Sequence, residues 1–162
     1  MKHTALYNMV EQQIRPWDVS NPALLEILHH MPRADFLPEA LRPFAYMDVE
    51  LPLTINGKDT RTKLMPPRLL ARMVQEVDLK GTENVALVGI GDGYLAALLA
   101  SFSKLLTVYE INEDILRFAQ ANLNQANIQN VNYELTNGLQ ASSDKFDVVV
   151  LAGSVSHLTP AL

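Results

Sequence analysis

The most informative stretch of this sequence is Val85-Ala86-Leu87-Val88-Gly89-Ile90-Gly91-Asp92-Gly93-Tyr94. Its first four residues form a short, continuously apolar run, which is typical of a parallel strand buried on both faces. Three glycines follow within five residues, and residues 94–102 have the apolar spacing of a helix. Glycine allows a sharp turn and a close approach of the backbone to a ligand. The stretch therefore predicts a strand, a tight glycine-rich loop and a helix that begins at the loop.

Downstream of this stretch, strands and helices continue to alternate. We expect strands over residues 105–109, 131–135 and 146–151. Asn112 can cap a helix that runs to about Ala126, between the first two of these strands. Alternating strands and helices indicate an α/β fold, with a Rossmann-like, doubly wound, mostly parallel sheet and right-handed crossovers.

Upstream of residue 80 the sequence is richer in helices and prolines. We expect helices over residues 4–14, from Ser20 or Asn21 onward, and from Pro66-Pro67 to about Val77. A short strand is expected over residues 49–55. We therefore interpret residues 1–80 as an N-terminal helical extension on the substrate side, packed on the same domain. Residues 81–162 form the Rossmann-like core.

Composition excludes several classes of function. The chain has 162 residues, a net charge of -5 and no cysteine. Without a basic block, nothing indicates nucleic acid or an anionic membrane as a partner. The four histidines lack metal-ligand spacing, so no metal is expected. Neither a signal peptide nor a membrane span is recognisable, and we expect a cytoplasmic protein.

Four features follow the predicted strands, and the carboxyl ends of parallel strands meet at one edge of a sheet, where ligands bind. They are the glycine loop, Glu110, Asn137-Gly138 and Gly153-Ser154. Glu110 lies 21 residues after Gly89, and a carboxylate there can accept hydrogen bonds from both hydroxyls of an adenosine ribose. Taken alone, each of the three loops also fits an ordinary turn.

The glycine loop favours S-adenosylmethionine over NAD. In the register that starts where the strand ends, Tyr94 occupies the third glycine position of the dinucleotide fingerprint and blocks close packing of helix on strand. A register shifted to Gly91 fits a looser form, but it puts Asp92 in a loop meant for pyrophosphate. S-adenosylmethionine has no phosphate and carries a positive sulfonium, which tolerates an acid. No Walker-type lysine follows the glycines.

The chain resembles the protein-L-isoaspartate O-methyltransferases over its whole length. The segment 85–94 is similar to their first motif, VLEIGTGSGY, and 32–38 is similar to their PR-x-x-F-V-P. Further resemblances are those of 45–48 to A-Y-x-D, of 108–111 to the ribose-binding V-x-E-I, of Asn137-Gly138 to Asp-Gly and of 146–154 to F-D-A-I-I-V-T-A-A.

The resemblance implies a fold of the class I methyltransferase type and an enzyme that methylates the carboxylate of damaged, isoaspartyl residues, a step of protein repair. Its cofactor would be S-adenosyl-L-methionine and its partner a protein or peptide substrate. A carboxylate is already ionised at neutral pH, so no general base is required. The residues that the resemblance assigns to the cofactor are Gly89, Ile90, Gly91, Tyr94, Glu110, Ile111, Asn137 and Gly138.

Three positions depart from the family pattern. Leu87 replaces the acid of the first motif, and Asn137 replaces the aspartate beside the adenine. Residues 63–67 stand where the family has T-I-S-Q-P, so Met65 replaces the serine or threonine associated with the substrate. A thioether cannot donate the hydrogen bond of a hydroxyl. No catalytic residue is assigned, and the substrate-side candidates are Leu64, Met65, Pro66, Ser154 and His157.

Two other functions stay open. Met65 favours a methyltransferase of the same fold that acts on another substrate. Leu87 and the end of the chain at Leu162 favour a non-catalytic domain that binds S-adenosylmethionine. The family continues past this point with further strands, so the core is expected to be C-terminally truncated. The strand over 146–151 would then form a sheet edge that is covered by the N-terminal segment, by a neighbouring chain through self-association, or not at all.

Overall fold

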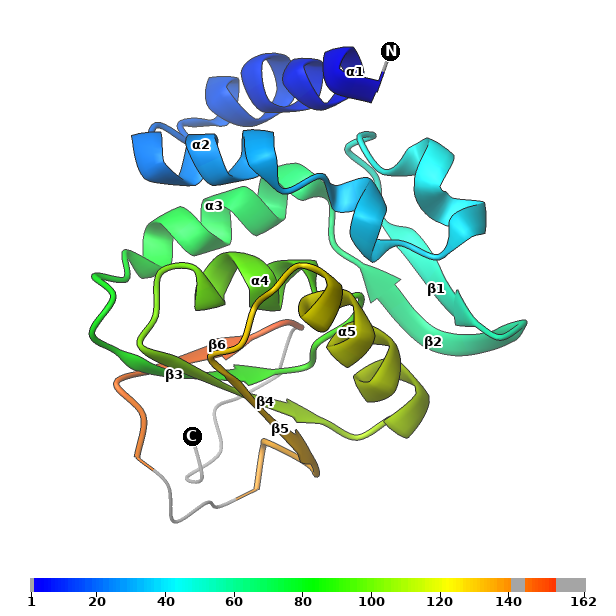
Figure 1. Ribbon diagram of the computed structural model, residues 1–162, viewed down its shortest axis with the longest axis vertical. Coiled ribbons are helices and arrows are strands. Elements are labelled where there is room, and N and C mark those ends of the chain that lie inside the picture. Colours follow the sequence, from blue (N-terminus) through cyan, green and yellow to red (C-terminus); the bar gives the residue numbers. More distant parts are fainter. Residues whose placement is uncertain (1, 141–144, 154–162) are drawn as a thin grey trace. The chain divides into compact units, whose positions relative to one another are not determined.

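The computed structural model of the chain describes residues 2–140 and 145–153 (Figure 1). The chain divides into two units, Met1–Asp78 and Leu79–Leu162. The strands of the first unit form a two-stranded sheet and those of the second a four-stranded sheet. None of the helices within the described residues is long and apolar enough to cross a membrane.

The first unit begins with a helical segment whose geometry changes along its length. Helix α1 spans Lys2–Asn8, a π-helical turn spans Met9–Ile14 and a 3₁₀ turn spans Arg15–Trp17. The sequence predicted one continuous helix over 4–14. It did not predict the π turn, because apolar spacing does not distinguish a π-helix from an α-helix.

Helix α2 spans Pro22–His30 and starts as predicted. Asn21 caps it, since its Oδ1 accepts a hydrogen bond from Leu24 N at 3.1 Å, and Pro22 stands in the first turn. Two 3₁₀ segments follow, Arg33–Phe36 and Glu39–Phe44. Their prolines, at positions 32, 38 and 43, explain why this stretch forms no longer helix.

An antiparallel hairpin and a helix complete the first unit. Strand β1 spans Leu51–Ile55 and strand β2 spans Lys58–Leu64, joined through Asn56-Gly57. Both turn residues have positive φ, 51° and 77°, as a tight two-residue hairpin turn requires. The sequence predicted a strand near β1 but not β2, whose residues Lys58–Lys63 are all polar or charged. Helix α3 spans Pro67–Val77, as predicted from Pro66-Pro67.

The second unit is an α/β domain, and the predicted fold class is confirmed. Its four strands are parallel and lie in the order β5-β4-β3-β6. Strand β3 spans Asn84–Val88, β4 Leu105–Glu110, β5 Val131–Leu135 and β6 Val148–Leu151. Helices α4 (Tyr94–Ala100) and α5 (Glu113–Gln125) pack against β4 on one face of the sheet (Figure 1).

Strand β6 is shorter than the predicted 146–151. Asp147 precedes it, donating its backbone N–H to Asn84 O at 2.9 Å, while its Oδ2 accepts from Asn84 N at 2.8 Å. This side-chain contact takes the place of a ladder hydrogen bond, so the strand begins at Val148. Among the described residues β6 pairs only with β3, so it lies at one edge of the sheet.

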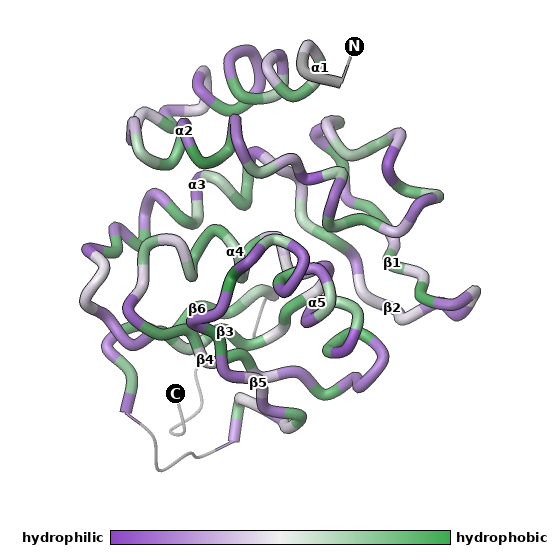
Figure 2. Tube along the Cα trace, viewed as in Figure 1, coloured by the Kyte–Doolittle hydropathy of each residue, from purple (hydrophilic) through white to green (hydrophobic). Residues whose placement is uncertain are grey.

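The core of the second unit is formed by β3, β4 and helix α4. All seven residues of α4 are buried, so this helix is apolar on every side, as a helix inside a core is. Figure 2 shows this apolar colour along α4. Strands β4 and β5 extend the sheet on one side of β3, and β6 then returns to pair on the other side. The strand order therefore reverses at β3, and ligands bind at such a reversal in sheets of this kind.

Candidate functional site

The glycine loop follows β3, at the point where the strand order reverses. Gly89, Gly91 and Gly93 have φ values of 87°, 57° and 89°, a region that residues with side chains rarely adopt. The loop is held at its start, because Gly89 N donates to Tyr109 O of β4 at 2.8 Å. It also closes on itself through a 3.0 Å hydrogen bond from Gly93 N to Ile90 O. The backbone of the loop is therefore fixed before any ligand arrives.

The end of the loop is packed against α5. A Cβ atom on Gly93 would lie 3.2 Å from Ala119 O and 3.3 Å from Ala119 Cβ, so glycine allows this close approach. Asn122 Nδ2 donates to Asp92 O at 2.9 Å. The buried Asp92 carboxylate accepts from Tyr94 N at 3.0 Å, at the start of α4, where a negative charge is favoured.

Glu110, the last residue of β4, is 8% exposed and lies beside the glycine loop. Its Oε2 accepts a hydrogen bond from Ile90 N at 3.2 Å. Its Oε1 accepts from Ile111 N at 2.9 Å and from Asn112 N at 3.0 Å. A carboxylate has about four acceptor positions. Three are taken by backbone N–H groups of the described residues, which leaves one position, on Oε2, for a ligand.

Asn137-Gly138 follows β5 and lies against the neighbouring strands. A Cβ atom on Gly138 would lie 2.6 Å from Tyr109 Cβ and 2.9 Å from a methyl carbon of Val88, so only glycine fits here. Asn137 Oδ1 accepts from Leu139 N at 3.0 Å, which closes a turn of the kind that asparagine favours. The turn is thereby fixed at the same edge as the glycine loop.

Two apolar side chains lie exposed at this edge. Ile111, directly after Glu110, is 75% exposed, and Leu135, at the end of β5, is 51% exposed. Leu135 pairs in register with Glu110, so the two residues are neighbours across the strands. Ile111 was predicted as a cofactor residue, and Leu135 was not. The position of Leu135 as the last residue of a predicted strand before Asn137-Gly138 could have indicated this residue.

The other predicted cofactor residues also come together at this edge. Gly89, Ile90 and Gly91 are in the loop, and the side chain of Ile90 is buried. The Tyr94 side chain is fully buried, so its ring belongs to the core of the unit. Ala152, after β6, has its Cβ 3.5 Å from the Cβ position of Gly89, which puts the end of β6 beside the loop as well.

The described segments that form this edge carry no lysine or arginine side chain. Lysine and arginine are absent from residues 89–93, 110–112, 136–140 and 151–153. The same segments contain two buried carboxylates, Asp92 and Glu110. Such a site suits a ligand that carries positive charge and is unfavourable for a pyrophosphate, which needs cations or free N–H groups.

Three of the predicted substrate-side residues lie in the first unit. Leu64 ends β2 and is buried, and Met65 and Pro66 connect β2 to α3 in the first unit. Arg33, fully buried, donates from Nη2 to Met65 O at 2.8 Å, which holds this connection in place. No role for Arg33 was predicted from the sequence. Ser154 and His157 lie outside the described residues.

The family model for Protein-L-isoaspartate(D-aspartate) O-methyltransferase (PCMT) matches residues 5–160. The chain belongs to this family. It is 32% identical over 151 residues to a protein-L-isoaspartate O-methyltransferase of a Picosynechococcus species, covering 92% of this chain and 66% of that protein. The chain thus spans slightly less than two thirds of the length of this relative.

Solved structures of the PCMT family share the fold. One protein-L-isoaspartate O-methyltransferase superposes with a TM-score of 0.78 at 20% identity, covering 99% of this chain and 50% of that chain. A Plasmodium falciparum protein described as a member of the same family, solved in complex with S-adenosyl-L-homocysteine, superposes with a TM-score of 0.70 at 17% identity. The superposition covers 75% of that protein and 97% of this chain. The predicted family and the predicted fold are both confirmed.

Proposed function

We propose that this chain binds S-adenosyl-L-methionine at the carboxyl edge of the four-stranded sheet and transfers the methyl group to the carboxylate of isoaspartyl residues in proteins. The observation that carries the proposal is Glu110, a buried carboxylate held beside the positive-φ glycine loop in a site whose described segments contain no lysine or arginine. Membership of the PCMT family supports the reaction. The substrate would accordingly be a damaged protein or peptide.

The ribose of the cofactor is assigned to Glu110. The acceptor position left on Oε2 can receive one ribose hydroxyl as a charge-assisted hydrogen bond. The sequence alone suggested that the carboxylate receives both hydroxyls. With Oε1 already accepting two backbone N–H groups, one hydroxyl bond to this side chain is the better assignment.

The adenine is assigned to the space between the ends of β4 and β5. Ile111 and Leu135 offer exposed apolar surface there, and burying it under a planar base is favourable. Asn137 lies in the adjoining turn, and its Oδ1 keeps a second lone pair with which it can accept from the adenine amino group. The methionine end, with its sulfonium, is assigned to the glycine loop, where Asp92 provides negative charge.

When bound, S-adenosyl-L-methionine supplies an electrophilic methyl group. The substrate carboxylate oxygen would accept this methyl group, with the methyl ester and S-adenosyl-L-homocysteine as products. The carboxylate is ionised at neutral pH, so the residues of the chain need to remove no proton. Their contribution is to orient the cofactor through Glu110 and the rigid loop, and to exclude water from the reacting atoms.

A second candidate is transfer to an acceptor other than isoaspartate. It is favoured by Met65, which stands where a hydroxyl residue is associated with the isoaspartyl substrate and cannot donate a hydrogen bond. Arg33 fixes the backbone of Met65 through its carbonyl oxygen, so this departure occurs at an ordered position.

A methyl-transfer assay distinguishes the two candidates. The chain is incubated with S-adenosyl-L-methionine carrying a labelled methyl group, and with peptides that contain isoaspartate or ordinary aspartate at the same position. We expect base-labile label on the isoaspartyl peptide only. Label on neither peptide, from a protein that binds the cofactor, would rule out the proposed substrate and leave the second candidate.

A further inference from the structure

Asparagine followed directly by glycine occurs twice in the chain, at Asn56-Gly57 and at Asn137-Gly138. In such a pair the glycine nitrogen can attack the side-chain amide of the asparagine, because glycine has no side chain that hinders the approach. The attack requires rotation of the backbone between the two residues. Its rate therefore depends on how readily the surrounding turn opens.

The Asn56-Gly57 pair forms the exposed tip of the β1–β2 hairpin (Figure 1). Within the part of the chain that the structure describes, no hydrogen bond involves the Asn56 side chain. A Cβ atom on Gly57 would meet no other atom within 4 Å. The amide that would react is therefore open to water, and no packed neighbour opposes its movement.

A bulge separates this tip from the base of the hairpin. The register of the two strands shifts between Leu53 and Thr54, where Thr60 and Arg61 of β2 have no partner in β1. A bulge interrupts the ladder of hydrogen bonds between strands. The tip can therefore open without separating the remainder of β1 from β2. The residue pairs beyond the bulge are Thr54–Asp59 and Ile55–Lys58.

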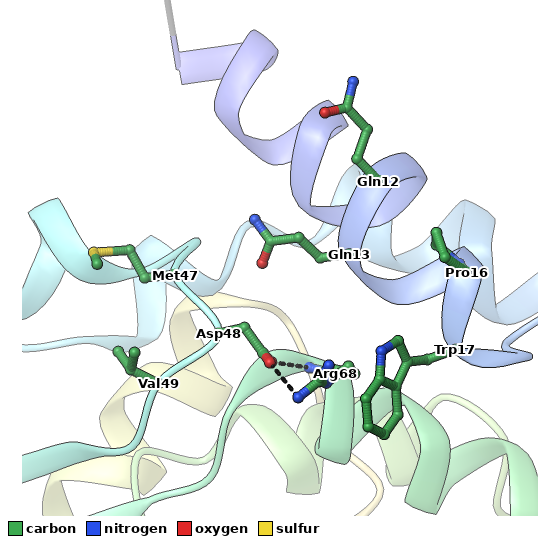
Figure 3. A pocket seen from close by; sticks show the side chains of 8 residues that line it. All are labelled: Gln12, Gln13, Pro16, Trp17, Met47, Asp48, Val49 and Arg68. Carbon is green, nitrogen blue, oxygen red and sulfur yellow. Dashed lines mark hydrogen bonds and ion pairs between the residues drawn. The ribbon is translucent and has the colours of Figure 1, made fainter.

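The base of the hairpin, by contrast, is firmly anchored. Asp48 precedes β1, and its Oδ2 lies 2.8 Å from Arg68 Nη2 (Figure 3). The Arg68 guanidinium in turn lies over the Trp17 ring, 3.4 Å from the ring centroid. The first residue pair of the ladder, Leu51–Leu64, is buried. Local opening is thereby confined to the tip.

The second pair, Asn137-Gly138, is held at both of its residues. Asn137 Oδ1 accepts a hydrogen bond from Leu139 N at 3.0 Å, which fixes the side chain. The position of a Cβ atom on Gly138 lies 2.6 Å from Tyr109 Cβ and 2.9 Å from Val88 Cγ2, so the backbone here is packed against two strands. Rotation of this backbone requires the turn to separate from the sheet, which costs packing free energy.

We propose that Asn56 is a site of spontaneous chemical modification, converted to aspartate and isoaspartate in the folded chain, while Asn137 is protected. Gly57 N forms a bond to Asn56 Cγ and loses its proton, and the Cγ–Nδ2 bond breaks to release ammonia. Water then opens the resulting cyclic imide. Cleavage between Gly57 N and Asn56 Cγ gives aspartate. Cleavage between Gly57 N and the main-chain carbonyl carbon gives isoaspartate, in which the backbone runs through Cγ.

Isoaspartate at position 56 changes the tip of the hairpin. The backbone gains a methylene carbon, and the neutral amide becomes a carboxylate. A tight two-residue turn does not fit the longer backbone, so we expect the residue pairs beyond the bulge to separate. The product belongs to the class of residue on which the proposed function acts, but its formation does not depend on that function.

Peptide mapping by mass spectrometry measures the modification at both positions of the same protein. The full chain is aged in mildly alkaline buffer at physiological temperature, without S-adenosyl-L-methionine. Synthetic peptides with aspartate or isoaspartate serve as standards. A local opening that costs about 1.4 kcal/mol slows the reaction tenfold. We expect Asn56 to be converted at least about tenfold faster than Asn137 in the folded chain, because only the Asn137 turn must first separate from the sheet.

Unfolding provides the control, since it removes the difference between the two turns. In concentrated urea, Asn56 and Asn137 should be converted at similar rates. Asn56→Gly keeps a residue suited to the positive φ of the turn, and it should remove the fast modification without altering circular dichroism. Equal rates at the two positions of the folded chain, or the same ratio of rates in urea as in the folded chain, would overturn the proposal.

Discussion

Gly138→Ala is expected to destabilise the second unit because no space exists for a methyl group at this position. The added Cβ would lie 2.6 Å from Tyr109 Cβ, 2.9 Å from Tyr109 Cγ and 2.9 Å from Val88 Cγ2. Tyr109 Cβ, the nearer of the two Tyr109 atoms, is bonded to the backbone of β4, so no rotamer change can move it aside. The turn after β5, or strand β4 itself, must shift instead.

The magnitude follows from two opposing effects. Forcing a methyl group into a packed site costs about 1–3 kcal/mol. Replacing glycine by alanine also restricts the unfolded chain, which stabilises the folded state by about 0.4–1 kcal/mol. The net loss is about 1–2 kcal/mol in the free energy of unfolding, or roughly 2–8 °C in Tm. Because the shifted turn lies beside Glu110, affinity for S-adenosyl-L-homocysteine should fall as well.

Gly153→Ala is the matched control. This glycine also follows a strand of the sheet, its φ lies outside the positive region, and no described atom lies within 4 Å of the position of its Cβ. Its replacement should leave stability unchanged or raise it by up to about 1 kcal/mol. Urea unfolding monitored by circular dichroism measures both variants. Equal stability of the two variants would refute the packing argument.

Three further outcomes are expected in the first unit. Gln75→Ala should lower the free energy of unfolding by about 1–3 kcal/mol, because Gln75 makes three hydrogen bonds to the chain before α2, and urea unfolding measures the loss. Glu76→Ala, which breaks only an exposed ion pair on the same helix, should cost about 0.5 kcal/mol or less in the same assay. Hydrogen bonds from Arg15 and His29 lower the pKa of Glu11, so this carboxylate stabilises the fold above pH 4.5, and the benefit is lost as pH falls through the lowered pKa. Glu11→Gln should therefore reduce the loss of stability between pH 7 and pH 3, and an unchanged acid slope would contradict the assignment.

The sequence predicted those helices, strands and loops that depend on residues next to one another in the chain. The run 85–94 predicted β3, the loop and α4 because apolar strand residues, glycines and a helical pattern follow one another directly. Asn112 predicted the start of α5, and its Oδ1 accepts from Asp114 N and Ile115 N. Since parallel strands end at one edge, the meeting of the loop, Glu110 and Gly138 could be predicted as well.

Features that depend on contacts between distant residues could not be predicted. Strand β2 has an all-polar sequence up to Leu64 and exists because it pairs with β1. The Glu110 carboxylate accepts hydrogen bonds from backbone N–H groups of two loops. The number of these bonds decides from how many ribose hydroxyls the carboxylate can still accept a hydrogen bond. The packing of Gly138 on Tyr109 joins positions 29 residues apart. These contacts form only in the assembled sheet, so the local sequence pattern does not indicate them.

Calorimetric titration with S-adenosyl-L-homocysteine tests the cofactor site most directly. It is performed on the unaltered chain, on Glu110→Ala and with NAD as the competing ligand. We expect saturable binding to the unaltered chain, affinity for NAD at least about tenfold weaker, and a loss of about 1.5–3 kcal/mol in binding free energy for the variant. Tighter binding of NAD, or unchanged affinity of Glu110→Ala, would contradict the proposed cofactor site.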